Sequence, residues 1–204
     1  MSDEGSAAAP LAVYRLLLER YGPQRWWPAD GPFEMMVGAI LTQSTAWVNV
    51  ERAIHNLKEA QALDPVALDE TPIDELARVI RPCGYYNVKA RRLKSLVHHL
   101  VTDFGGDLGR LFALDTAQLR RELLSIHGVG EETADSIMLY AAQRPVFVVD
   151  AYTRRIAGRL GLCPPHASYG DLQALFTGAL PADQALLNEY HALLVRHGKE
   201  ACRP

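Results

Sequence analysis

Apolar residues recur along most of the chain at intervals of three and four positions, which is the spacing of one face of an α-helix. Glycine or proline closes several of these periodic segments, as in Tyr21-Gly22-Pro23 and Pro82-Cys83-Gly84. The pattern predicts an all-α fold, with helices over residues 11–21, 33–41, 47–57, 73–80, 90–100, 119–124, 133–142, 151–160 and 185–196.

Two segments do not follow this pattern. Pro145–Val149, with the sequence PVFVV, is the one β-like stretch. It is short and begins with proline, so we expect a buried extended connector between helices and not a strand of a sheet. The first ten residues are small and polar, and we expect residues 1–10 to be disordered.

The composition of the 204 residues is that of a soluble globular protein, with 49% hydrophobic residues and a mean hydropathy of −0.06. We expect no membrane contact, because no apolar run approaches the length of a membrane span. The N-terminus lacks the basic start and apolar core of a signal peptide, so we expect a cytoplasmic protein. Its three cysteines are far apart and form no CxxC pair, which predicts reduced thiols and no metal site.

The charge balance excludes a general electrostatic attraction to nucleic acid, because 21 basic residues face 24 acidic ones. Any such role therefore depends on local clusters. Residues 81–94 hold five basic residues and no acid, and Arg154 and Arg155 follow Asp150 closely. Ordinary solvated helix faces would explain each cluster equally well.

The most informative segment runs from Leu123 to Asp150. A helix is expected to end near Ser125, residues 126–130 form a turn, and a second helix begins at Glu131 with acids in its first turn. This is a helix-hairpin-helix. Its glycines let backbone N–H groups at a helix N-terminus approach a DNA phosphate. A plain tight turn between two helices is the alternative explanation.

At this point the sequence resembles the helix-hairpin-helix DNA glycosylases of the endonuclease III superfamily. Their hairpin, LPGVGxKTA, and their catalytic aspartate, in VDxxxxR, are matched by IHGVGEETA (126–134) and VVDAYTRR (148–155). The segment ILTQSTAWVNVERA (40–53) is similar to the helix whose glutamine enters the DNA stack. GYYNVKARRLKSL (84–96) resembles the helix start GxYNxKA. The resemblance covers roughly residues 12–202.

The resemblance implies a two-lobed, all-α architecture and a monomer. Residues 28–144 would form a six-helix barrel domain that contains the helix-hairpin-helix at about 117–142. Residues 11–27 and 145–204, from both termini, would form a second helical lobe, with the active cleft between the two. The implied partner is double-stranded DNA that contains a damaged base.

The resemblance also implies which residues contact DNA. Gln43 would fill the gap that a flipped base leaves, although a polar residue at a helix start is the simpler interpretation of this residue alone. His127 stands where the family's hairpin has proline, and both a phosphate contact and simple exposure remain open for it. The expected DNA-binding residues are Gln43, Lys89, His127, Gly128, Val129, Gly130 and Arg154.

Asp150 is the implied catalytic residue. Its carboxylate would stabilise positive charge on the deoxyribose and orient or deprotonate the attacking water. An N-cap of the helix that starts at Ala151 is an alternative role, compatible with the first. In bifunctional relatives the lysine of GVGxKTA forms a Schiff base, but Glu132 occupies that position here. A carboxylate cannot form an imine, so we predict a monofunctional enzyme. Glu132 would contact the base or only complement the helix dipole.

The C-terminal segment HALLVRHGKEAC (191–202) resembles the helix that leads into the family's iron–sulfur loop. That loop requires four cysteines, and Cys202 would be the first of them. We therefore expect no cofactor in this chain, and a 4Fe-4S cluster only if further C-terminal cysteines follow the sequence given.

Trp26, Trp27 and Trp47 fall in segments that line the base pocket in the family's architecture. Indole faces stack on a flipped base and attract a cationic one, although tryptophans also serve as core residues. WWP, LTQxT and a hairpin without lysine are most similar to the 3-methyladenine DNA glycosylase III group. An alkylated purine such as 3-methyladenine is the expected substrate. The alternatives are a glycosylase for mismatched or oxidised pyrimidines and a non-catalytic DNA-binding protein, which the presence of Asp150 disfavours.

Overall fold

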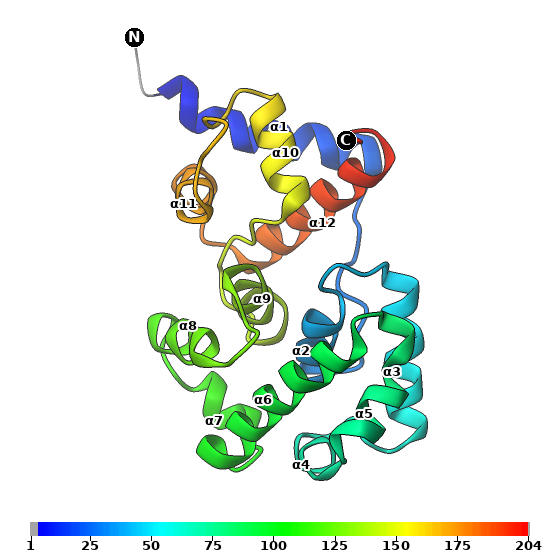
Figure 1. The fold of residues 1–204 in the computed structure, drawn as a ribbon. Helices are drawn as coiled ribbons and strands as arrows, with labels where there is room; N and C mark the ends of the chain where they lie inside the picture. Colours follow the sequence, from blue (N-terminus) through cyan, green and yellow to red (C-terminus); the bar gives the residue numbers. More distant parts are fainter. Residues whose placement is uncertain (1–3, 204) are drawn as a thin grey trace. The chain divides into compact units, whose positions relative to one another are not determined.

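The structure of the chain is a computed structural model that describes the backbone of residues 4–203 and the side chains of residues 9–203. The described residues form helices joined by turns and extended segments, without a β-strand, so the all-α prediction is confirmed (Figure 1). None of the described helices has the length and apolar character that a membrane crossing requires. The chain divides into two compact units, residues 29–142 and a unit made of residues up to 28 together with residues 143 onward.

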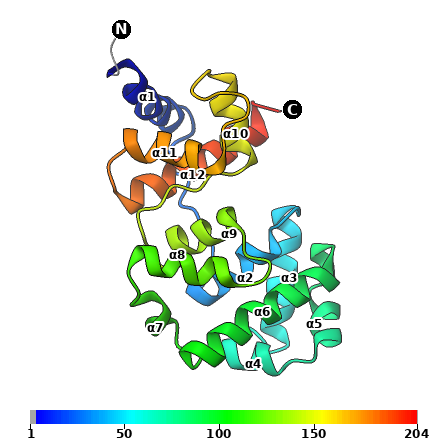
Figure 2. The same cartoon turned by 60° about the vertical axis from the view of Figure 1, so that its left-hand side comes forward.

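The unit of residues 29–142, here the central unit, is organised around α2. Every residue of α2 from Phe33 to Leu41 is buried, because α2 packs against α3, α6, α9 and η2. The long helix α6 carries α4 and α5 along its side (Figure 2). The elements are α2 (Pro32–Leu41), α3 (Trp47–Glu59), α4 (Pro65–Glu70), α5 (Ile73–Val79), η1 (Arg81–Cys83), α6 (Tyr86–Phe104), α7 (Leu108–Phe112), α8 (Thr116–Ser125), α9 (Glu131–Ser136) and the π-helical turn η2 (Ile137–Ala141).

Two short helices of the central unit, α4 and α7, escaped the periodicity analysis. Both are capped by an aspartate side chain, Asp64 for α4 and Asp107 for α7, which accepts from backbone N–H groups of the first turn. With only six and five residues, neither helix repeats an apolar position often enough to reveal a period. Their signal in the sequence is the cap and not the pattern.

The other unit, here the terminal unit, contains α1 (Glu4–Tyr21), α10 (Ala151–Arg159), α11 (Tyr169–Ala179) and α12 (Gln184–Glu200). α12 packs against α1 and α10, and α11 packs against α1. The rings of Phe147 and Phe176 stack with centroids 4.2 Å apart, and Tyr190 meets both edge-on. The segment Pro145–Val149 has no regular secondary structure, and Phe147, Val148 and Val149 are buried, so the prediction of a buried connector and not a strand is confirmed.

The expectation of disorder over residues 1–10 is wrong for residues 4–10, which belong to α1. Residues 1–3 lie outside the described residues. The run of alanines at 7–9 has the highest intrinsic helix propensity. In addition, the Tyr190 hydroxyl donates to the Pro10 carbonyl over 2.8 Å, which anchors this turn of α1 to α12. Pro10, at the end of this small and featureless stretch, is therefore held by a partner 180 positions away.

Candidate functional site

The hairpin of the central unit has one buried side and one exposed side. α8 ends at Ser125, α9 begins at Glu131, and the Val129 N–H donates to the Ile126 carbonyl over 3.0 Å within the turn. The side chains of Ile126 and Val129 are buried, whereas His127 and Gly130 are exposed. The two apolar side chains therefore anchor the turn. Any contact of Val129 with DNA is restricted to its backbone.

Gly128 is required in this turn for two separate reasons. Its φ of +90° lies in the left-handed region that favours glycine. A Cβ at this position would also lie only 2.2 Å from Cγ of Arg92, which belongs to α6. By contrast, a Cβ on Gly130 would meet nothing within 4 Å. The first glycine thus allows a close approach between the hairpin and α6.

Gln43 lies in the turn between α2 and α3 and joins this turn to the hairpin. Its Nε2 donates to Thr133 Oγ1 over 2.9 Å and to the Gly128 carbonyl over 3.2 Å. Its Oε1 accepts from Nη1 of Arg92. The side chain predicted to enter DNA is thus hydrogen-bonded within the central unit.

The structure corrects the role predicted for Lys89. Its side chain is 1% exposed, and Nζ donates to the carbonyls of Leu41 and Cys83 and to Thr45 Oγ1, over 2.9, 2.8 and 3.1 Å. Burial is the main cause that lowers the pKa of this ammonium. An ammonium has three N–H donors, and all three have protein acceptors here. The predicted contact of Lys89 with DNA is therefore wrong, and its role in this fold is structural.

Tyr85 is a candidate that the sequence analysis did not single out within the basic cluster of residues 81–94. It precedes α6 with a φ of +46°, an uncommon value for a residue other than glycine, and it is 74% exposed. An exposed aromatic ring in a strained backbone position is often functional. The signal in the sequence was the aromatic pair after Gly84 in a segment without acidic residues.

Asp150 in the terminal unit is held on two sides. As the N-cap of α10, its Oδ1 accepts from the Thr153 N–H over 2.7 Å, and Oδ2 lies 3.7 Å from Nε2 of His191 on α12. The side chain is 11% exposed. Burial alone would raise the pKa of this carboxyl, but the contact and charge of His191 and the Thr153 N–H outweigh burial and lower it below 3.8. Both predicted roles of Asp150 are thus compatible with its geometry, since the cap fixes a carboxylate that stays ionised.

His191 was missed by the sequence analysis as a partner of Asp150. It is buried on α12, 41 positions away in the sequence. A single histidine on an apolar helix face carries no local signal of its partner. The pairing of α10 with α12 brings the two side chains together.

The three tryptophans are divided between the two units. Trp26 and Trp27 form an edge-to-face pair in the terminal unit, with ring centroids 5.4 Å apart, and the Lys199 ammonium lies 5.9 Å from the Trp26 centroid. Trp47 begins α3 in the central unit, and its indole N–H donates to Glu51 over 2.8 Å. All three rings are half-buried. The structure therefore brings Trp26 and Trp27 together in one cluster of the terminal unit.

Glu132 and Arg154 are both exposed. Glu132 lies in the first turn of α9, next to Glu131, where an acid complements the helix dipole. Arg154, on α10, donates to the Ala167 carbonyl. One such bond leaves further N–H groups of a guanidinium available to a phosphate.

The residues of this chain do not fit a four-cysteine iron–sulfur cluster. The sequence given holds three cysteines, and in the described part of the chain no group of three or more histidine, cysteine or acidic side chains could hold a metal ion. Cys83 is buried, and the Cys202 thiol accepts from Arg159 over 3.2 Å. No step of the chemistry below depends on such a cluster.

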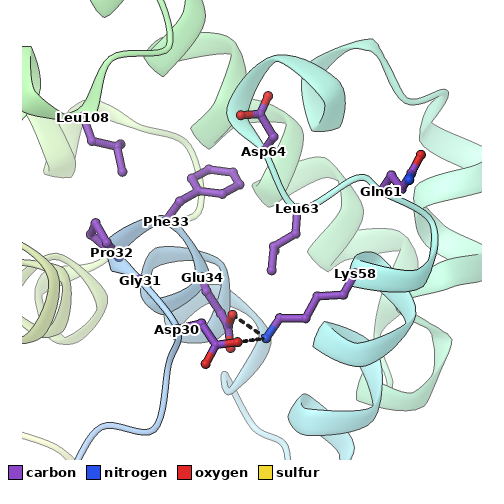
Figure 3. A pocket seen from close by; sticks show the side chains of 10 residues that line it. All are labelled: Asp30, Gly31, Pro32, Phe33, Glu34, Lys58, Gln61, Leu63, Asp64 and Leu108. Carbon is purple, nitrogen blue, oxygen red and sulfur yellow. Dashed lines mark hydrogen bonds and ion pairs between the residues drawn. The ribbon is translucent and has the colours of Figure 1, made fainter.

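A separate cavity of about 470 Å³ lies in the central unit (Figure 3). Phe33, Leu63 and Leu108 line its apolar side. At its edge, Lys58 Nζ bridges Asp30 and Glu34 over 2.6 and 2.8 Å. None of the predicted site residues lines this cavity, so the candidate site lies elsewhere.

Comparison with known proteins finds similarity over nearly the whole chain. A family model described as "HhH-GPD superfamily base excision DNA repair protein" matches residues 37–182. A Methanocaldococcus jannaschii protein, described provisionally as a DNA repair glycosylase, is 49% identical over 94% of this chain and 87% of its own. Endonuclease III of Sulfolobus acidocaldarius is 29% identical over 84% of this chain and 74% of its own. The crystal structure of H. pylori 3-methyladenine DNA glycosylase bound to 1,N6-ethenoadenine has a TM-score of 0.83 and 28% identity, covering 98% of this chain and 99% of that one.

Proposed function

Because the chain belongs to the HhH-GPD superfamily of base excision DNA repair proteins and is a DNA glycosylase, we propose that it hydrolyses the glycosidic bond of an alkylated purine such as 3-methyladenine, acting as a monomer on double-stranded DNA. The observation that carries this proposal is the largely buried carboxylate of Asp150 at the start of α10, whose pKa is held below its usual value by His191 and the Thr153 N–H. The similarity to the H. pylori 3-methyladenine DNA glycosylase over the full chain supports the substrate class.

The carboxylate of Asp150 suits hydrolysis through a positively charged sugar. As the bond from the base to C1′ breaks, positive charge develops on the deoxyribose, and a fixed negative charge nearby stabilises it. The same carboxylate orients a water or takes a proton from it as the water attacks C1′. The Thr153 N–H and His191 hold the carboxylate in place. An alkylated purine already carries positive charge, so its departure needs little acid catalysis.

The absence of a lysine in the hairpin supports hydrolysis without a lyase step. A Schiff base requires a neutral amine that reaches C1′. Glu132 stands where the bifunctional pattern has lysine, and a carboxylate cannot form an imine. The buried Lys89 has its three N–H groups directed at protein acceptors. We therefore expect an intact abasic strand as the product.

Contact with DNA is proposed for exposed groups of both units. The backbone of the hairpin, with His127 and Gly130 exposed, would bind a phosphate without regard to sequence. In the terminal unit, Arg154 would contact a second phosphate. Tyr85, exposed and held in a strained backbone conformation, would stack against a base. Trp26, Trp27 and Trp47 are proposed to recognise the flipped base, because indole faces attract a cationic purine.

Base release from methylated duplex DNA tests this proposal, with strand nicking scored before and after alkali. The wild type should release free methylated purine, with nicks appearing only after alkali. Asp150→Asn should lose both, since an asparagine keeps the cap but carries no charge. The matched control is Asp183→Asn, which changes the aspartate that caps α12 in the same unit and should retain activity.

Other outcomes of this assay would contradict separate parts of the proposal. Nicks without alkali would show that a lyase step exists. Release of thymine or an oxidised pyrimidine, without alkylated purine, would overturn the tryptophan argument and leave the role of Asp150 intact. Binding of DNA without release of any base would favour a non-catalytic DNA-binding protein.

A further inference from the structure

The Gln43 amide makes three hydrogen bonds within the central unit. A glutamine amide can make four in all, two as a donor and two through its carbonyl oxygen. Both donors of Gln43 are used, by Thr133 Oγ1 and by the Gly128 carbonyl, and its oxygen accepts from Arg92. A side chain that enters a DNA duplex would have to give up these bonds. The conformation is therefore a retracted one.

Arg92 makes this retracted conformation possible. It starts on α6 and runs across the hairpin so closely that a Cβ on Gly128 would fall 2.2 Å from its Cγ and 2.7 Å from its Cδ. Its guanidinium then reaches Oε1 of Gln43, in the turn that follows α2. One side chain thus connects α6, the hairpin and this turn, and it is half-buried at the place where the hairpin would bind a phosphate.

The backbone around Gln43 is held separately, by Lys89. The buried ammonium donates to the Leu41 carbonyl, at the end of α2, and to Thr45 Oγ1, two residues beyond Gln43. The Thr45 hydroxyl donates in turn to the Cys83 carbonyl. These bonds fix both ends of the turn in the interior of the unit. Release of the Gln43 side chain would therefore not require the turn itself to unfold.

We propose that Arg92 is a positioning residue that holds Gln43 retracted against the hairpin in the DNA-free protein, and that a DNA phosphate bound at the hairpin draws the Arg92 guanidinium away and releases Gln43. This inference rests on the proposed function, because DNA is taken as the source of the phosphate and as the reason for Gln43 to move. An anionic phosphate accepts hydrogen bonds roughly twice as strong as those of a neutral amide oxygen, and it can accept two from one guanidinium. Arg92 therefore gains by replacing Gln43 with a phosphate as its acceptor. This replacement breaks the bond between Arg92 and Oε1 of Gln43.

The retracted state is tested in the protein without DNA, through the side-chain amide protons of Gln43 observed by NMR. Arg92→Met keeps the aliphatic stem over Gly128 and removes the guanidinium. Hydrogen exchange of the Gln43 amide should then become roughly fivefold faster or more, as expected for the loss of one hydrogen bond of about 1 kcal/mol. The matched control Arg91→Met removes the same charge from the neighbouring exposed position of α6 and should leave the exchange unchanged. Equal exchange in the wild type and Arg92→Met would overturn the proposal.

A second measurement needs no variant. Inorganic phosphate, added to the wild type against sodium chloride at equal ionic strength, should move the Gln43 amide signals toward their positions in Arg92→Met. If phosphate leaves the signals in place, the proposal that a phosphate draws Arg92 away from Gln43 is wrong. This test uses only the wild type, so altered folding of Arg92→Met cannot explain its result.

Release by DNA is tested with a duplex that carries a single tetrahydrofuran abasic-site analogue, whose missing base leaves a gap. The Gln43 amide of the wild type should lose its free-state frequency and protection when this duplex binds. Retention of both in the complex would overturn the release. If neither this duplex nor an undamaged one binds, the proposed function fails and release by DNA fails with it. The amide exchange in the free protein still decides separately whether Arg92 holds Gln43.

Discussion

The two units hold their functional side chains by different means. In the terminal unit the proposed chemistry depends on one carboxylate, Asp150, which is largely buried and fixed by a backbone N–H and a buried histidine. In the central unit the hairpin region distributes its hydrogen bonds over several side chains, among them Gln43, Arg92 and Lys89. A reacting centre needs one charge in one place, whereas binding to a DNA backbone sums many small contacts. Single substitutions should therefore abolish activity in the first region and have graded effects in the second.

The largest expected effect is that of Asp150→Asn on base release. Loss of the charge should lower the rate by about 10²–10⁴-fold, the range for a positioned acid–base or electrostatic group. The temperature of unfolding should fall only modestly, because asparagine keeps the cap and loses only the stabilisation that the charge draws from His191. Single-turnover release and thermal unfolding measure the two effects.

The complementary change at the other aspartate cap of the terminal unit is Asp183→Ala. It removes a side chain that accepts from the N–H groups of Ala185 and Leu186, and should cost about 1 kcal/mol of stability with no loss of turnover. If both aspartate variants lost stability and activity together, the special role of Asp150 would be refuted.

Lys89→Met should have the next largest effect, on stability. It leaves the carbonyls of Leu41 and Cys83 and the Thr45 hydroxyl without their buried donor, at an expected cost of about 2–4 kcal/mol in the free energy of unfolding. The control is Lys58→Met. The Lys58 side chain is 38% exposed, so water can replace its ammonium beside Asp30 and the buried Glu34, and the loss of stability should be smaller than for Lys89. Chemical denaturation compares the two variants, and similar losses would contradict the structural role of Lys89.

The buried position of Lys89 could not be predicted from the sequence, whereas several other features could. The hairpin, the cap at Asp150 and the buried connector Pro145–Val149 were predictable because each is encoded within a few consecutive residues. The burial of Lys89 depends on acceptors from two other segments, up to 48 positions away. In the basic cluster at residues 81–94 its charge was indistinguishable from that of Arg91, which is exposed.

The pairs Asp150–His191 and Arg92–Gln43 were missed for the same physical reason. Each joins side chains 41 or 49 positions apart, which only helix packing brings together. α11 escaped for a different reason, since only Leu172 and Phe176 of its residues are buried. Two apolar positions give too short a pattern to identify a helix. Its capping box, Ser168 with Asp171, was the local signal that identifies it.

Alanine substitutions at the two hairpin glycines should differ in their effect on stability, and the difference should be smaller than the loss expected for Lys89→Met. Gly128→Ala forces a Cβ against Arg92 and places an alanine at a φ of +90°, which should cost about 1–3 kcal/mol and disturb the Gln43 contacts. Gly130→Ala has open space and a φ of −94°, and should stay within about 0.5 kcal/mol of the wild type. Thermal unfolding of the two variants checks this difference. Equal stability would show that Arg92 does not lie across Gly128.

The smallest expected effect is that of moderate acid on the charge of Asp150. Because burial is outweighed by His191 and the Thr153 N–H, the pKa of the carboxyl in the folded protein lies below its ordinary value of 3.8. The assigned carboxyl carbon of Asp150 should therefore show no NMR titration step between pH 7 and pH 4, and an inflection only below 3.8. The stability that the ionised group contributes is present above pH 3.8 and is lost as pH falls through the lower folded value. An inflection at or above pH 4 would mean that burial dominates, and the fixed negative charge on which the proposed chemistry depends would then weaken in mild acid.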